Sequence, residues 1–85
     1  MIENKVLVTV NVPSLENKYD VYIPVNRKIY SVIKMLCNSL FTISQGAFIM
    51  KDNYLLYDAN PGNIFDINAL VRDTDIRNGS TIILL

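Results

Sequence analysis

The stretch YDVYIPVNRKIYSVIKMLCNSL, residues 19–40, decides the fold because the spacing of its apolar residues changes in the middle. In the first part, apolar side chains stand at every second position, as in a strand with one buried face. In the second part they recur every three or four positions, as on one face of a helix. These helix positions are Ile29, Val32, Ile33, Leu36, Cys37 and Leu40. We therefore predict a strand over 19–25 and then a helix of about four turns.

Further strands are expected on both sides of this stretch. Valines at every second position from Val6 to Val12 predict a strand upstream, and the polar turn over 13–18 joins the two strands into a hairpin. The elements expected after the helix are a short strand over 47–51, a tight turn at 52–53, a strand over 54–57, a loop over 58–68 around Asn60-Pro61-Gly62, a turn region over 73–80 and a last strand over 81–85.

The apolar face of the helix needs a partner, and the inward residues of the strands supply one. We therefore predict an α+β fold in which one helix packs across a mixed sheet. A chain of 85 residues, of which 51% are hydrophobic, is expected to form one domain over residues 1–85. Eight basic residues balance eight acidic ones, so the charge favours neither a nucleic-acid partner nor an anionic membrane surface.

The composition also argues against most catalytic and metal sites. The chain has no histidine and one cysteine, which excludes a disulfide, a Cys/His zinc site and a Ser–His or Cys–His nucleophile within one chain. Cys37 lies on the apolar helix face, so we expect it to be a core residue. We expect no enzymatic activity, no cofactor and no metal. No apolar run approaches the roughly 20 residues of a membrane span, so no direct membrane insertion is expected.

The order of the elements resembles the ubiquitin-like superfamily, the β-grasp fold, over residues 5–85. Three segments carry the resemblance: YDVYIP at 19–24 running into the helix at 29–40, the pair Leu55-Leu56 after a tight turn, and the ending IRNGSTIILL at 76–85. The sequence is most similar to the small YukD/EsaB-like proteins of Gram-positive type VII secretion loci. It departs from the ubiquitin-like minimum in the loop over 59–68, which is longer.

This resemblance implies a cytosolic accessory component of a type VII (ESX, WXG-substrate) secretion system. Its partner would be a protein, such as a membrane component of the apparatus, and that partner would hold it at the inner face of the membrane. The sequence given ends at Leu85 without the Gly-Gly tail that ubiquitin-type modifiers carry. We therefore expect a binding module that is not conjugated. The alternatives are a ubiquitin-like modifier or sulfur carrier, and a regulatory domain that associates with itself as a homodimer.

The last strand suggests where a partner binds. Residues 82–85 are all apolar, and strand side chains alternate between faces, so two of them must leave the core side. By analogy with ubiquitin, we expect Ile82 and Leu84 to point inward and Ile83 and Leu85 outward. The same alternation in the strand over 47–51 turns Phe48 and Met50 inward and Ile49 outward.

Ile49, Ile83 and Leu85 are thus expected to share an exposed sheet face, and exposed contiguous apolar area tends to mark an interaction site. Two aromatic residues complete the candidate protein-binding site: Tyr22, which faces outward from the second strand, and Phe65, in the loop over 59–68. An unbroken apolar run has two other readings. The same loop could cover the strand, or a second copy of the chain could cover it.

Overall fold

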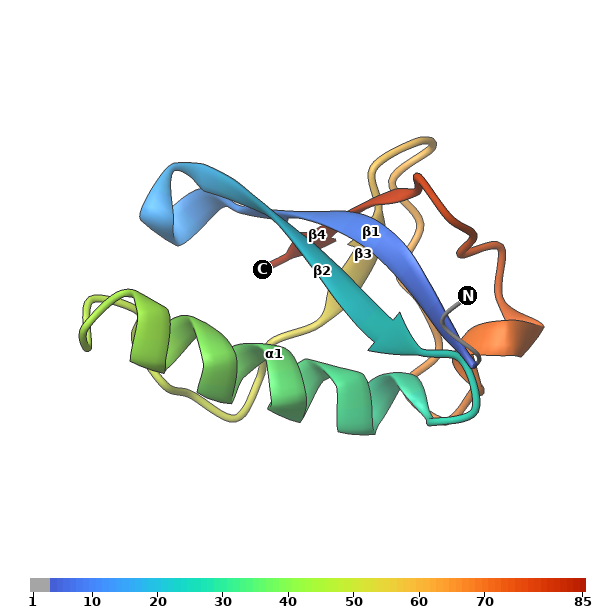
Figure 1. Ribbon diagram of the computed structural model, residues 1–85, viewed down its shortest axis with the longest axis horizontal. Coiled ribbons are helices and arrows are strands. Elements are labelled where there is room, and N and C mark those ends of the chain that lie inside the picture. The colour runs from blue at the N-terminus through green and yellow to red at the C-terminus, as the bar shows by residue number, and fades with distance from the viewer. Residues whose placement is uncertain (1–3) are drawn as a thin grey trace.

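Four strands form a sheet, and one helix lies across one face of it in the computed structural model, which describes residues 4–85 (Figure 1). The elements in chain order are β1 (Lys5–Val12), the 3-10 helix η1 (Pro13–Leu15), β2 (Asn17–Pro24), α1 (Ile29–Ile43), β3 (Leu56–Asp58), the 3-10 helix η2 (Val71–Asp73) and β4 (Thr81–Leu84). The predicted hairpin, helix and last strand are confirmed, and the helix extends three residues beyond Leu40.

The sheet has the strand order β2-β1-β4-β3. β1 and β2 form an antiparallel hairpin whose register runs from Lys5 opposite Pro24 to Val12 opposite Asn17. The two central strands, β1 and β4, are parallel, with Val10 opposite Ile82. β3 pairs antiparallel with the other edge of β4. The result is the mixed sheet that the sequence predicted.

The helix begins without a side-chain cap, and a distant segment satisfies its first backbone donors. The N–H groups of Ile29 and Tyr30 donate to the carbonyls of Ala69 and Ile67, at 2.9 and 3.0 Å. The first N–H groups of a helix have no partner inside it, so this segment takes the role of a capping residue. The start of α1 is therefore tied to the chain just before η2.

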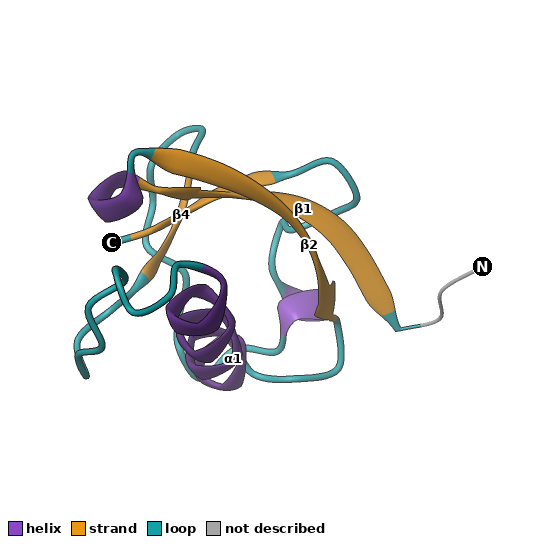
Figure 2. Cartoon of the chain, turned by 60° about the vertical axis from the view of Figure 1, so that its left-hand side comes forward, coloured by secondary structure: helices purple, strands orange, loops and turns teal. Residues whose placement is uncertain are grey.

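One apolar core fills the space between α1 and the sheet, which Figure 2 shows with the helix beneath the strands. The six predicted helix positions, Cys37 included, are all buried. They meet the inward side chains of β1, β2 and β4, among them Val10, Ile23 and Ile82. Burial raises the pKa of the Cys37 thiol above its ordinary value of 9.0, so the thiolate is disfavoured.

The predicted strand over 47–51 is wrong. These residues form no strand. Phe48 is buried and Ile49 is exposed, as predicted, but Met50, which was expected inside, is 47% exposed. Phe48 is buried and stacks on Tyr54 with ring centroids 4.9 Å apart. Tyr54 also holds the segment by donating its hydroxyl hydrogen to the carbonyl of Ile49 at 2.7 Å. Because residues 47–51 do not pair with a strand, their side chains need not alternate between faces. The stacking of Phe48 on Tyr54 determines which side chain enters the core.

The strand predicted over 54–57 lies slightly later, at Leu56–Asp58. Its pairing begins at Leu55, which exchanges reciprocal backbone hydrogen bonds of 3.0 and 3.1 Å with Leu85. The loop after it folds back beside β3. Asp58 N–H donates to the Asn63 carbonyl, and Phe65 N–H to the Leu56 carbonyl, at 2.8 and 2.9 Å. The loop therefore lies along the outer edge of β3.

Replacing the aromatic anchor should destabilise the protein strongly. Phe48→Ala removes a fully buried ring and its stacking on Tyr54, so we expect a loss of about 3–5 kcal/mol in the free energy of unfolding. The matched control Met50→Ala, two residues away and exposed, should change it by less than about 0.5 kcal/mol. Urea denaturation followed by circular dichroism measures both. Equal effects would show that Phe48 does not anchor the segment.

The buried thiol provides a second test. The raised pKa means that the folded state holds the Cys37 proton more tightly than the unfolded state. The contribution of this thiol to stability is therefore complete below pH 9.0 and falls as the pH rises above it. We expect the stability difference between native protein and Cys37→Ala to shrink between pH 8 and 10 in urea denaturation. A difference that stays constant over this range would contradict the raised pKa.

Candidate functional site

The face of the sheet opposite α1 has no helix packed over it in the part of the chain described (Figure 2). Side chains alternate along each strand, so the positions between the buried ones point to this outer face. The outward positions are Leu7, Thr9 and Asn11 on β1, Lys18, Asp20 and Tyr22 on β2, Thr81 and Ile83 on β4, and Tyr57 on β3. On this outer face, the side chains near β3 differ in chemistry from those on β1 and β2.

Apolar side chains gather where β3 meets β4. Ile83 stands between Asn11 on β1 and Tyr57 on β3, and Tyr57 in turn pairs with Ile64 of the following loop. Leu55 and Leu85 form the next pair along the same two strands. We call Leu55, Tyr57, Ile64, Ile83 and Leu85 the β3–β4 corner. Ile64 and Leu85 are 57% and 58% exposed, and the other three are half-buried.

The middle of the outer face is polar. Thr9 donates its hydroxyl hydrogen to the carboxylate of Asp20 at 2.9 Å, and Thr81 stands on the other side of Thr9. Lys18 and Asn11 face each other across β1 and β2. The apolar β3–β4 corner is therefore bounded by polar side chains toward β1 and β2, which gives it the outline of a discrete patch.

The predicted directions in the last strand are confirmed, because Ile82 and Leu84 are buried while Leu85 is exposed and Ile83 half-buried. Ile49 lies elsewhere. Its side chain is 70% exposed, but residues 47–51 form no strand, so the structure does not bring it onto the sheet face with Ile83. That part of the expectation is wrong, because the strand that pairs with β4 is β3.

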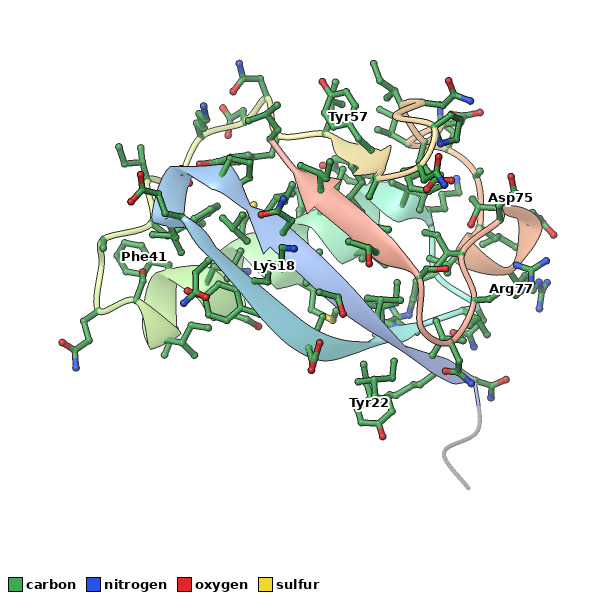
Figure 3. All side chains as sticks on the ribbon, turned by 90° about the horizontal axis from the view of Figure 1, so that it is seen from above. Lys18, Tyr22, Phe41, Tyr57, Asp75 and Arg77 are labelled. Carbon is green, nitrogen blue, oxygen red and sulfur yellow. The ribbon has the colours of Figure 1, made fainter. Side chains whose placement is uncertain are left out.

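The two predicted aromatic residues also lie apart from Ile83 and Leu85. Tyr22 faces outward and is 49% exposed, but it stands on β2, at the opposite edge of the sheet from Tyr57 (Figure 3). Phe65 is half-buried and packs against the core. Of the predicted site residues, the structure thus brings Ile83 and Leu85 together and leaves the other three separate.

The predicted site did not include Leu55, Tyr57 or Ile64. The signal for the first two was present, because alternation around the buried Leu56 turns both to the outer face once residues 55–58 are paired with β4. The sequence analysis predicted strands over both 47–51 and 54–57, and it placed Ile49 of the first one beside Ile83. For Ile64 the sequence left open whether the loop extends the patch or covers it, because its pairing with Tyr57 depends on how the loop folds back.

The described residues hold no group of three or more His, Cys, Asp or Glu placed to bind a metal ion. Lys34 lies over the ring of Tyr30 at 4.7 Å, and the hydrogen bond to Tyr30 raises the pKa of this lysine. Burial likewise raises the pKa of Tyr54.

No helix in residues 4–85 has the length and apolar character needed to cross a membrane.

Comparison with known proteins supports the fold. No protein-family model and no curated protein matches the chain. Among solved structures, the ubiquitin-like domain of the Mycobacterium tuberculosis type VII secretion system protein EccD1 superposes with a TM-score of 0.75 at 12% sequence identity, covering 95% of this chain and 97% of that domain. A chain of the MycP5-free ESX-5 inner membrane complex superposes with a TM-score of 0.70 at 11% identity over 96% of this chain, which corresponds to 21% of that longer chain.

The fold also occurs in a different setting. A chain of the toluene 4-monooxygenase HD complex superposes with a TM-score of 0.75 at 7% identity, covering 94% of this chain and 95% of the other. Identities this low establish shared architecture and leave function to be argued from the surface. The mixed four-stranded sheet with one helix packed across it is the ubiquitin-like β-grasp fold, as the sequence predicted.

Proposed function

We propose that this protein is a non-enzymatic ubiquitin-like interaction module, one domain over residues 1–85, that serves as a cytosolic accessory component of a type VII (ESX, WXG-substrate) secretion system. The proposal rests on the resemblance of residues 5–85 to YukD/EsaB-like proteins and on a fold that matches the ubiquitin-like domain of a type VII secretion protein. The observation that carries the proposal is the apolar β3–β4 corner. In this proposal the protein binds its partner through this corner, on the outer face of the sheet.

The chemistry of this corner supports binding to protein. The corner joins two strongly exposed aliphatic side chains, Ile64 and Leu85, to the half-buried Tyr57 and Ile83. Contiguous exposed apolar area on a small protein tends to mark an interaction site, and tyrosine is enriched in such interfaces. The net charge of zero supports a protein partner over nucleic acid or anionic lipid.

The lack of histidine and the burial of the one thiol also fit a binding role. The sequence has no histidine to act as a general base, and its one thiol, on Cys37, is buried with a raised pKa. A thiol is nucleophilic as its thiolate, so this one is poorly suited to attack a substrate. The activity proposed is therefore association and not catalysis, and it needs neither a cofactor nor a metal.

The proposed partner is a membrane component of the secretion apparatus, which would hold this protein at the inner face of the membrane. Support comes from the similarity to a chain of an ESX-5 inner membrane complex. The competing reading, that the loop over 59–68 covers the corner, is disfavoured by its geometry. The loop pairs with the edge of β3 through Asn63 and Phe65 and leaves Ile64 57% exposed.

Placing charges on the corner should weaken binding strongly. We expect Ile64→Asp/Leu85→Asp to reduce recovery of a membrane secretion subunit from detergent-solubilised cells at least about tenfold, because both side chains are lost from an apolar contact. Secretion of WXG-type substrates should fall with it. The matched control is Ile43→Asp, an equally exposed isoleucine at the end of α1, which should bind as the native protein does.

Two further measurements separate the alternatives. Ile49→Asp tests whether this exposed residue outside the sheet belongs to the site. Sedimentation velocity of the native protein at micromolar concentration tests self-association through the corner. Equal recovery by the native protein and the corner variant, with both folded by circular dichroism, would show that the partner binds elsewhere. A dimer abolished by Ile64→Asp/Leu85→Asp would assign the corner to a second copy.

A further inference from the structure

A groove runs along α1 on the side where the chain returns from the end of the helix toward β3 (Figure 1). It has a volume of about 620 Å³, which lies in the range of small-molecule sites. One wall is the side of α1 from Tyr30 to Asn38, residues 50–55 form the other wall, and Ile67 also lines the groove. Eight residues of helix extend over about 12 Å, so the groove is elongated.

The floor of the groove is apolar. Ile33, Cys37 and Tyr54 line it, and each is less than one tenth exposed. Met50 and Ile67 stand at its rim, where they are 47% and 38% exposed. An apolar chain lying in the groove would therefore remove apolar surface from water, which is favourable.

The walls of the groove are fixed by contacts that need no ligand. The ring of Tyr54 stacks on Phe48, and its hydroxyl donates to the carbonyl of Ile49 at 2.7 Å. At the start of the helix, the N–H of Tyr30 donates to the carbonyl of Ile67 at 3.0 Å. A ligand therefore meets a preformed site, and binding does not have to order these segments.

Two lysines stand on the two walls. Nζ of Lys34 lies 4.7 Å from the ring centroid of Tyr30, and Nζ of Lys51 lies 4.8 Å from that of Tyr54. The pKa of Lys34 is raised mainly by Tyr30 and to a lesser extent by the charge of Asp52, so this carboxylate lies near Lys34. No other acidic residue lines the groove. Two lysines and one aspartate leave the lining with one net positive charge.

We propose that this groove binds a small amphipathic carboxylate such as a medium-chain fatty acid. Its chain lies along Ile33, Cys37 and Met50, and its carboxylate stands beside Lys51, because Asp52 already offsets the charge of Lys34. A single negative charge matches the lining, and an electrically neutral protein favours a free anion over an anionic membrane surface. Of the β3–β4 corner only Leu55 lines the groove, so this inference goes beyond the proposed function and does not depend on it.

The probe is sodium decanoate below the concentration at which it forms micelles, and decylamine is the matched cation with the same chain. We expect decanoate to shift the amide resonances of Asn38, Met50 and Asn53 saturably, with half-saturation below about 1 mM. Decylamine should bind at least about fivefold more weakly, because its charge has the same sign as that of the lining.

Substitutions at exposed positions test the two parts of the ligand separately. Lys51→Glu should weaken decanoate binding about fivefold, and Asp52→Asn should strengthen it about two- to threefold by removing a repelling charge. Met50→Trp should weaken it at least about tenfold by filling the groove. Its matched control is Met35→Trp, at an exposed position of α1 that does not line this groove, which should bind as the native protein does.

Several outcomes would overturn the proposal: no saturable shift with decanoate, equal binding of decanoate and decylamine, or unchanged binding by a folded Lys51→Glu. Shifts confined to Tyr57, Ile64 and Ile83 would overturn it in favour of the β3–β4 corner. Binding to vesicles of phosphatidylcholine and phosphatidylglycerol without binding of free decanoate would overturn it in favour of a membrane surface. Shifts of the groove amides on dilution without a probe would do so in favour of a second copy.

Discussion

The parallel pairing of β1 with β4 is the constraint on which the rest of the structure depends. It places Thr9 beside Thr81 and Val10 beside Ile82, and the N–H of Leu7 reaches the side chain of Asn78, 71 residues later. Parallel neighbours require a long crossover, and α1 provides it by packing against the inner face of the sheet. Since β1 and β4 occupy the centre, β2 and β3 are left as the two edges, with different surroundings.

This arrangement separates two kinds of surface. On the β3 side, apolar residues of β4 face outward as well as inward, so Ile83 and Leu85 meet Tyr57 and Ile64 and form an apolar patch. On the β2 side, the outer positions Lys18 and Asp20 are charged, and the outward Tyr22 stands next to them along the strand. The outer face of the sheet is therefore apolar toward β3 and charged toward β2.

The segments outside the regular elements have specific structural tasks. The chain before η2 supplies the carbonyls that accept the first N–H groups of α1, so the start of the helix depends on residues about 40 positions later. Phe48 enters the core from an irregular segment, and the hydroxyl of Tyr54 fixes that segment through the carbonyl of Ile49. The loop after β3 shields one sheet edge. Together these contacts explain how only one edge remains open in the described residues.

Local patterns in the sequence determined the β1–β2 hairpin, the buried face of α1 with Cys37 in it, and the inward direction of Ile82 and Leu84. Each depends on periodicity within a few neighbouring residues, which sets the side a residue faces as soon as the element forms. Only the tertiary structure decided that residues 47–51 are not a strand, that Leu55, Tyr57 and Ile64 join Ile83 and Leu85, and that β2 is the open edge. A short apolar run such as AFIMK can be a strand or an anchored loop, and the choice depends on which segment pairs with β4. That pairing is made between residues far apart in the chain, so its register leaves no trace in the local pattern.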